Sequence, residues 1–199
     1  MGKTVGIGVT GGIAAYKIVD LVSRLKKDGF EVVVIMTEGA TKFVTPLTFK
    51  TMSGREVLTD LWQESEHYKV QHIGVAEEVD LLVIAPATAN FIAKMAHGIA
   101  DDLLSTIVLA VTSPVLVVPS MNSNMYMNPI VQSNLNKLST TGYRVMAPEE
   151  GELACGVSGP GRLPEIENIY AEIRSLLHKK QDLTGKRFLI NAGSTCEDI

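Results

Sequence analysis

The amino-acid sequence predicts an α/β protein, a three-layer sandwich with a parallel sheet of the Rossmann-like or flavodoxin-like kind. Two observations predict it. Apolar runs of strand length alternate along the 199 residues with amphipathic segments of helix length. The runs are nearly continuous and rich in β-branched residues, which is typical of strands that are buried on both faces. Five such runs, joined by crossover helices, define the predicted sheet.

The first half of the chain contains two predicted strands and two predicted helices. A strand over Thr4–Val9 leads through the turn Thr10–Gly12 into a helix over Ile13–Lys27, where apolar residues recur at helical spacing. Glu31–Met36 (EVVVIM) is the second strand, and Pro46–Met52 is a short helix. A strand, a helix and a second strand in this order are typical of a parallel sheet.

The second half repeats this alternation. The predicted strands are Asp80–Ala85, which Pro86 ends, Val115–Val118 and Gly142–Met146. The predicted helices are Val75–Glu78, Asp101–Val111, Pro129–Thr140 and Glu165–Lys179. Between the last strand and the last helix, residues 147–164 form a predicted loop rich in glycine and proline.

The end of the chain starts a different unit. Residues 182–199 (DLTGKRFLINAGSTCEDI) begin a new strand at Phe188–Ile190 and a new glycine turn, and no helix follows. We therefore expect residues 1–180 to form one domain. We expect residues 181–199 to be a linker and the truncated start of a second domain.

The composition excludes several classes of function. The chain has 18 Lys+Arg against 22 Asp+Glu and no basic cluster, which argues against nucleic acid or an anionic membrane as partner. Two cysteines are too few for a disulfide framework or a thiolate metal site, and no other cluster indicates a metal. Neither a signal-peptide pattern nor a membrane-length apolar run is present, so we expect a cytoplasmic protein.

The first glycine turn is a candidate phosphate site. Gly6–Gly11 matches the dinucleotide string GxGxxG, but the strand residues up to Val9 leave Thr10–Gly12 as the turn. Backbone N–H groups at the start of the following helix suit a single phosphate. A tight turn that binds no ligand is the alternative.

Threonines follow three of the predicted strands, at Thr10, Thr37 and Thr88. Ligands of open α/β sheets bind at the carboxyl ends of strands, so these hydroxyl groups are expected to converge on one crevice. The alternative is that Thr37 and Thr88 cap the helices that follow them.

Three further segments contain residues suited to chemistry. His72 lies just before a helical segment, Asn122 lies in the Asn- and Met-rich residues 119–129, and Cys155 lies in the glycine-rich residues 151–162. An imidazole exchanges protons near neutral pH, an amide binds a carboxylate, and a thiol on a flap donates a proton. The alternatives are a structural histidine, a loop of Asx turns with space-filling methionines, and a surface loop with an incidental cysteine.

Seven segments together carry a resemblance to a known family. They are VTGGIAAYK (9–17), MTEGATKFVTPLTF (36–49), HI (72–73), APATANFIAK (85–94), GIADDLLST (98–106), PSMNSNMY (119–126) and LACGVSGPGR (153–162). The chain resembles the homo-oligomeric flavin-containing cysteine decarboxylases, specifically the decarboxylase half of bacterial bifunctional phosphopantothenoylcysteine decarboxylase/phosphopantothenate–cysteine ligases of coenzyme A biosynthesis. Residues 182–195 resemble the start of the ligase half, whose chemistry cannot reside in this chain. One departure is Ser120, where relatives often have alanine.

The resemblance implies an FMN cofactor in a crevice at a subunit boundary. The implied cofactor contacts are Gly11, Gly12, Thr37, Phe43, Thr88, Asn90, Asp102 and Ser105. The implied substrate contacts are Asn122, Met125, Gly156 and Arg162. In this family's mechanism His72 assists oxidation and decarboxylation, Asn122 holds the substrate carboxylate and Cys155 protonates an enethiol.

The implied reaction is decarboxylation of the small molecule 4′-phospho-N-pantothenoyl-L-cysteine to 4′-phosphopantetheine and CO₂. Oxidation beside the thiol gives a thioaldehyde from which CO₂ leaves, and the reduced flavin then returns the hydride. The resemblance also implies a homo-oligomer, a trimer or a dodecamer of trimers. The alternatives are a peptidyl-cysteine decarboxylase, a prenyl-FMN synthase relative, and a non-catalytic flavin-binding regulatory subunit. The first is disfavoured by residues 153–162, and the others by the presence of His72, Asn122 and Cys155 together.

Overall fold

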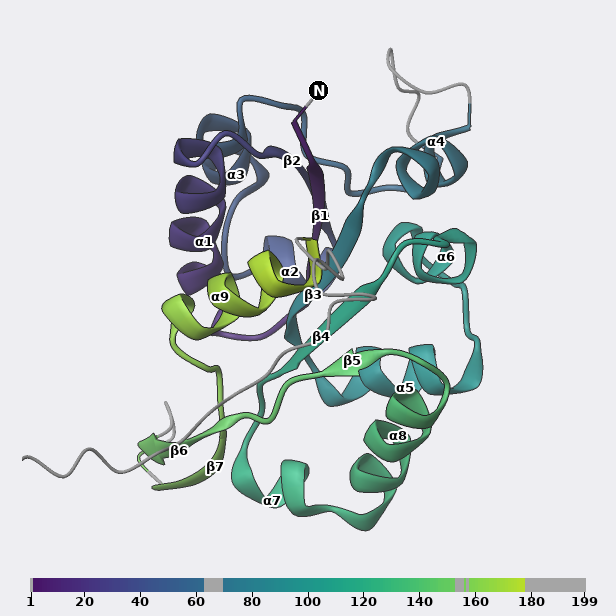
Figure 1. The fold of residues 1–199 in the computed structure, drawn as a ribbon. Helices are drawn as coiled ribbons and strands as arrows, with labels where there is room; N and C mark the ends of the chain where they lie inside the picture. Colours follow the sequence, from purple (N-terminus) through teal and green to yellow (C-terminus); the bar gives the residue numbers. More distant parts are fainter. Residues whose placement is uncertain (1, 63–69, 153–155, 157, 178–199) are drawn as a thin grey trace, which may run out of the picture.

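A computed structural model describes residues 2–62, 70–152, 156 and 158–177. Its centre is a five-stranded parallel sheet with strand order β2-β1-β3-β4-β5 (Figure 1). The strands are β1 (Thr4–Val9), β2 (Glu31–Met36), β3 (Leu81–Ala87), β4 (Val115–Pro119) and β5 (Arg144–Val145). This order is that of a flavodoxin-like fold, which confirms the predicted fold class.

Helices cover both faces of the sheet (Figure 1). The described helices are α1 (Ala15–Lys27), α2 (Glu38–Thr41), α3 (Pro46–Ser53), α4 (Gln71–Glu78), α5 (Ala89–His97), α6 (Leu103–Ala110), α7 (Ser123–Met127), α8 (Pro129–Thr140) and α9 (Ile166–Leu177). Helices α1, α3 and α9 pack on one face, and α4, α5, α6 and α8 pack on the other. Within the described residues, none of these helices has the length and apolar character needed to cross a membrane.

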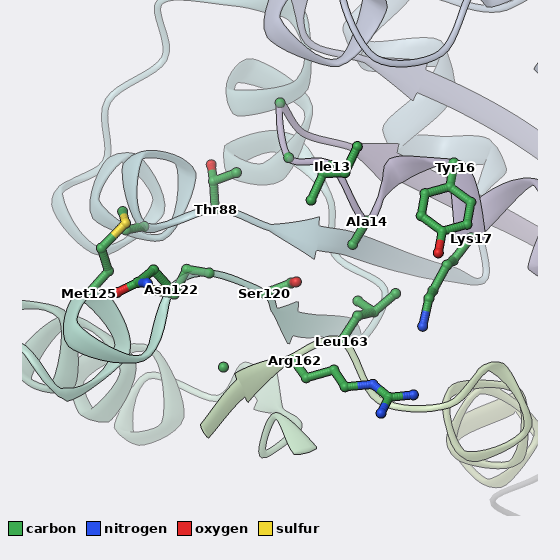
Figure 2. Close-up of a pocket in the computed structure, with 15 residues that line it drawn as sticks. Ile13, Ala14, Tyr16, Lys17, Thr88, Ser120, Asn122, Met125, Arg162 and Leu163 are labelled. Carbon is green, nitrogen blue, oxygen red and sulfur yellow. The ribbon is translucent and has the colours of Figure 1, made fainter. Parts of the chain in front are cut away.

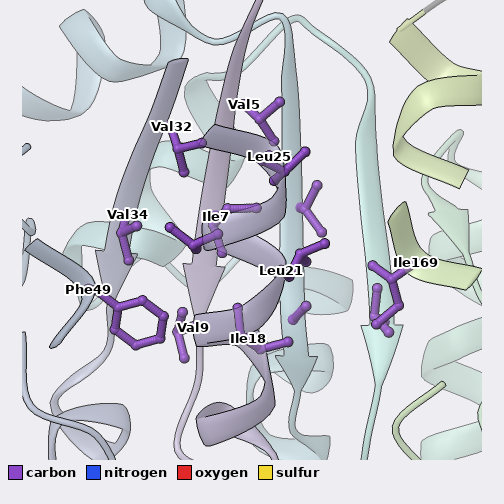
Figure 3. Close-up of a cluster of buried hydrophobic side chains, with 14 of the residues drawn as sticks. Val5, Ile7, Val9, Ile18, Leu21, Leu25, Val32, Val34, Phe49 and Ile169 are labelled. Carbon is purple, nitrogen blue, oxygen red and sulfur yellow. The ribbon is translucent and has the colours of Figure 1, made fainter. Parts of the chain in front are cut away.

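Two hydrophobic cores hold the three layers together, one on each face of the sheet. In the first, Val5, Ile7 and Val9 of β1 meet buried side chains of α1 and of α9 (Figure 3). The second contains Val33 and Ile35, the alternate residues of β2, which face the opposite helix layer. Strands β2, β3 and β4 therefore bury side chains in both directions, as their continuous apolar sequences predict.

Two glycines of β1 bring the second helix layer close to the sheet. A Cβ at Gly8 would lie 2.6 Å from Leu104 Cδ1 of α6 and 2.8 Å from Ile84 Cδ1. A Cβ at Gly6 would lie 3.0 Å from Leu82 Cδ1. These two glycines lie within β1 and serve packing, so they are not part of the turn that follows the strand. The placement of that turn at Thr10–Gly12 is confirmed.

Two predicted boundaries were wrong: the end of the third strand and the start of the helix that precedes it. Strand β3 passes Pro86 and ends at Ala87, because the ladder between β3 and β4 shifts register between Ile84 and Ala87 and needs no N–H from proline there. Helix α4 begins at Gln71 rather than Val75, so His72 lies in its first turn.

The glycine-rich residues 147–164 were expected to be a loop, and this was also wrong. They contain the antiparallel strands β6 (Glu149–Glu152) and β7 (Ser158–Arg162). Backbone pairing forms this hairpin despite the low strand propensity of glycine and proline. Conversely, β5 has two residues instead of the five expected, and helices α2, α5 and α7 were not predicted. The strand expected at Phe188–Ile190 lies outside the described residues.

Candidate functional site

The carboxyl ends of the parallel strands surround a cavity of about 710 Å³ (Figure 2). It lies where the order of the strands reverses, between β1 and β3, the usual ligand position in such sheets. The residues that line it are Gly11, Gly12, Ile13, Ala14, Tyr16, Lys17, Thr88, Ala89, Ser120, Met121, Asn122, Met125, Gly161, Arg162 and Leu163. Six of the predicted site residues are among them: Gly11, Gly12, Thr88, Asn122, Met125 and Arg162.

Helix α1 begins at this cavity without a side-chain cap. The backbone N–H groups of Ile13 and Ala14 make no hydrogen bond within the described part of the chain. Helices α2, α5, α6, α7 and α8 each begin with a capping side chain. The start of α1 is therefore available to an anion, which would complete its hydrogen bonds and meet the positive end of the helix dipole.

The turn before α1 is fixed by close backbone contact. A Cβ at Gly11 would lie 2.9 Å from the carbonyl carbon of Gly39, at the start of α2. The hydroxyl group of buried Thr10 donates to the Pro86 carbonyl at 2.6 Å and accepts from Thr88 N–H at 3.0 Å. These contacts hold the ends of β1 and β3 together under the cavity.

The capping interpretation of Thr37 and Thr88 is confirmed. The Thr37 hydroxyl accepts from Ala40 N–H, and the Thr88 hydroxyl accepts from Phe91 N–H, each at 3.3 Å. Thr88 also lines the cavity, whereas Thr37 does not. Thr88 therefore both caps α5 and lines the cavity.

The loop after β4 places Asn122 at the cavity. Asn122 caps α7, its Oδ1 accepting from Asn124 N–H at 2.9 Å, which is the Asx turn considered from the sequence. The hairpin strand β7 joins this loop through a hydrogen bond from Met121 N–H to the Gly161 carbonyl at 2.9 Å. Gly161 has a φ of +126° and lies against the Met121 carbonyl, where a side chain would not fit. The Asn122 loop and the hairpin therefore form one wall.

The remaining predicted residues lie outside the cavity. Asp102 and Ser105 form a capping box at the start of α6, with Ser105 N–H donating to Asp102 at 2.8 Å. Asp102 also accepts from Lys94 at 2.8 Å. Phe43 follows the C-terminal end of α2, Asn90 lies in the first turn of α5, and both are exposed. Their assignment to the cofactor stays a prediction.

His72 and Gly156 are also not among the residues that line the cavity. His72 is partly buried in the first turn of α4. Gly156 has a φ of +77°, in the region that favours glycine, and does not line the cavity. Cys155 lies outside the described residues, so its predicted role stays a prediction.

Sequence reasoning missed several residues of the cavity wall. Ile13 and Ala14 directly precede α1, Tyr16 and Lys17 lie in its first turn, and Leu163 follows β7. The signal was present for the first four, because a helix that begins at a strand's carboxyl end directs its first turn to the ligand crevice. Leu163 depends on the unpredicted hairpin.

The fold and the cavity define a flavodoxin-like α/β protein with a ligand site at the carboxyl edge of its sheet. The Flavoprotein family model matches residues 1–178, and the chain belongs to this family. It is therefore a member of a family of flavin-binding proteins, as the resemblance in its motifs predicted.

Individual relatives give further comparisons. The chain is 47% identical over 199 residues to the coenzyme A biosynthesis bifunctional protein CoaBC of Bacillus subtilis (strain 168), covering 99% of this chain and 49% of that protein. It is 41% identical over 198 residues to the CoaBC protein of Escherichia coli (strain K12), covering 100% of this chain and 49% of that protein. The chain thus spans about half the length of the curated relatives it matches.

Solved structures share the fold. A PPC decarboxylase mutant complexed with pantothenoylaminoethenethiol matches with a TM-score of 0.78 and 31% identity, over 87% of this chain and 97% of that one. The FMN-dependent cysteine decarboxylase SpaF matches with a TM-score of 0.78 and 33% identity, over 88% and 95%. The FMN binding protein AtHal3 matches with a TM-score of 0.74 and 31% identity, over 87% and 96%.

Proposed function

We propose that this chain is an FMN-dependent decarboxylase that converts 4′-phospho-N-pantothenoyl-L-cysteine to 4′-phosphopantetheine and CO₂ in coenzyme A biosynthesis. The observation that carries the proposal is the cavity that combines the uncapped start of α1 with Asn122. Both lie in segments that resemble the cysteine decarboxylases, and similar proteins are named for this pathway and this reaction. We further propose residues 1–180 as the decarboxylase domain and residues 181–199 as the start of a ligase half.

The residues of the cavity suit FMN. Its volume of about 710 Å³ is within the range of small-molecule sites. Gly11, Gly12 and the free N–H groups at the start of α1 would hold the phosphate, and Thr88 would contact the rest of the cofactor. When bound, FMN supplies a two-electron acceptor for the carbon beside the substrate thiol and a donor for the last step.

Asn122 would bind the substrate carboxylate. Its side chain is held by the cap of α7, and an amide donates to a carboxylate without carrying a charge that would hinder loss of CO₂. Cys155, by its resemblance, would protonate the enethiol at the last step. The Asn122 loop and strand β7 share a backbone hydrogen bond, so the strand that follows Cys155 in the sequence is attached next to Asn122.

We propose that the working form is a homo-oligomer, a trimer or a dodecamer of trimers. His72 and Phe43 lie outside the cavity of their own chain, and a cofactor at a subunit boundary would receive them from a neighbouring copy. Ile13, Tyr16 and Ile130 are 55%, 59% and 70% exposed, which is typical of surfaces that associate. Light scattering after gel filtration measures the assembly. A monomer with full activity would contradict this part of the proposal.

We also propose a cytoplasmic location.

The first experiment is an absorption spectrum of the purified chain followed by a decarboxylation assay. We expect visible flavin bands that remain with the protein on gel filtration, and CO₂ release from the phosphorylated substrate. A peptide ending in cysteine serves as the competing substrate. If the enzyme prefers the peptide, the proposed substrate is wrong and the chain is a peptidyl-cysteine decarboxylase. A colourless protein that takes up no added FMN would overturn the proposal.

A further inference from the structure

The cavity has two polar ends of different chemistry (Figure 2). Asn122 and Met125 lie at one end, and Lys17 and Arg162 lie at the other. The wall between the two ends includes Leu163 and other apolar side chains. A ligand that fills the cavity would therefore have a group that hydrogen-bonds to the neutral amide of Asn122 at one end. At its other end it would have an anionic group that contacts Lys17 and Arg162.

Lys17 is the unusual member of this cationic end. Lys17 is partly buried in the first turn of α1, and its side chain makes no hydrogen bond or ion pair within the described part of the chain. The described lysines that also lack an ion pair, Lys27 and Lys137, are exposed to solvent. An anion bound in the cavity would supply the counter-charge that Lys17 lacks among the described residues, and would gain a charge-assisted hydrogen bond from it.

Arg162 is held in place at the same end. Its guanidinium forms an ion pair with Glu165, and it lies over Gly151, where a Cβ would be 3.1 Å from Nη1. Glu149, which is paired with Arg162 in the hairpin, binds the start of α9. Its carboxylate accepts from Glu165 N–H and from Asn168 Nδ2, each at 3.0 Å. Glu165 thus orients Arg162, while the charge of Lys17 stays uncompensated.

Two separate anion positions follow from this geometry. The free N–H groups of Ile13 and Ala14 lie at the start of α1, beside Gly11 and Gly12. The Lys17 side chain extends away from them, toward Arg162 (Figure 2). A single phosphate at the start of the helix would leave the Lys17 and Arg162 end without a ligand.

We propose that Lys17, together with Arg162, binds the terminal phosphate of the substrate and determines specificity for the phosphorylated form. This inference rests on the proposed function. The substrate carries its carboxylate at one end and its phosphate at the other, which matches Asn122 at one end of the cavity and the two cations at the other. A lysine binds phosphate as a compact point charge, and an arginine adds directed hydrogen bonds.

The test compares substrates with and without the phosphate. In the Lys17→Met variant we expect kcat/KM for 4′-phospho-N-pantothenoyl-cysteine to fall about tenfold to a hundredfold, mainly through KM, because a charge-assisted hydrogen bond is lost. Turnover of N-pantothenoyl-cysteine should change less than about twofold, since it lacks the group that Lys17 contacts. Lys17→Arg should restore most of the preference. Lys27→Met, the same change at the other end of α1, is the matched control.

A binding measurement separates the possible outcomes. Calorimetric titration with 4′-phosphopantetheine and with pantetheine should show a preference for the phosphorylated compound in the wild type that Lys17→Met loses, with FMN content unchanged. Loss of FMN in the variant would overturn the inference, because Lys17 would then hold the cofactor phosphate. An equal effect on both compounds would overturn it as well. If the wild type releases no CO₂ from either substrate, the proposed function fails. If the wild type releases CO₂ and Lys17→Met keeps the same preference for the phosphorylated substrate, only the inference about Lys17 is contradicted.

Discussion

The starts of helices α1 and α6 show two different uses of the same backbone groups. Both helices have N–H groups that no preceding turn can satisfy. At α6 the Asp102 carboxylate accepts from Ser105 N–H at 2.8 Å, and the Ser105 hydroxyl accepts from Asp102 N–H at 3.0 Å. At α1 no side chain does this.

The presence or absence of a capping side chain distinguishes a helix start that is stabilised within the fold from one that can bind a ligand. At the start of α6 the capping box satisfies the N–H groups of Asp102 and Ser105 without a ligand, so these polar residues stabilise the fold. The start of α1 has no capping side chain and opens onto the cavity. A bound ligand could therefore accept the hydrogen bonds that a cap would otherwise accept. Of the predicted cofactor contacts, Asp102 and Ser105 lie at the capped start of α6, and Gly11 and Gly12 lie at the uncapped start of α1. The assignment of all four to the cofactor stays a prediction.

Removing the cap of α6 tests the structural half of this comparison. Asp102→Ala deletes the acceptor for Ser105 N–H and a partner of Lys94, so we expect the free energy of unfolding to fall by about 1–2 kcal/mol. Urea denaturation measures it. Asp102→Asn keeps an acceptor oxygen and should lose less.

The same variants test the expected cofactor role of Asp102. If FMN binds Asp102→Ala and the wild type equally well, the residue acts only on stability. If FMN affinity falls in Asp102→Ala without a stability change, the residue is a ligand contact and the distinction between the two helix starts is wrong.

A carboxylate at the start of α1 tests the functional half. Ile13 is exposed at the cavity, so Ile13→Asp places a negative charge beside the free N–H groups. We expect FMN to bind about tenfold more weakly, because the charge competes with and repels the phosphate, while the apoprotein gains about 0.3–1 kcal/mol from the helix dipole. Fluorescence titration with FMN and thermal unfolding of the apoprotein measure the two effects.

Ile13→Asn is the matched control for that experiment. It removes the same apolar side chain and adds no charge, so it should bind FMN more tightly than Ile13→Asp. Equal affinities in the two variants would show that the helix start does not bind the phosphate.

Much of this architecture could be predicted from the sequence. Strands β1 and β2 and helix α8 lie where their apolar periodicity or their proline start placed them. These elements depend on local patterns, namely strands buried on both faces and a helix that starts at Pro129. The turn at Thr10–Gly12 followed for the same reason.

The unpredicted parts depend on contacts between distant residues. The β6–β7 hairpin pairs Glu149 with Arg162 in a segment whose glycines and prolines indicate a loop, and it brings Leu163 to the cavity. Strand β3 continues past Pro86 because its partner β4 shifts register there. Three polar residues of the candidate site, Thr88, Asn122 and Arg162, were predicted from motifs, but which predicted residues share one cavity depends on this tertiary packing.

The smallest expected effect concerns Asp101, which precedes the capping box of α6. A hydrogen bond from Lys94 lowers the pKa of the Asp101 carboxyl below its usual value. A depressed pKa in the folded state means that the ion pair stabilises the protein above the pKa of the unfolded chain, and that this contribution is lost as the pH falls through the folded-state pKa. Asp101→Asn should therefore be slightly less stable than the wild type at neutral pH, with the difference vanishing in acid. Urea denaturation across the acidic range measures it. Because the Asp102–Ser105 box remains, the loss should be smaller than in Asp102→Ala. An equal loss would mean that Lys94, rather than the capping box, stabilises the start of α6.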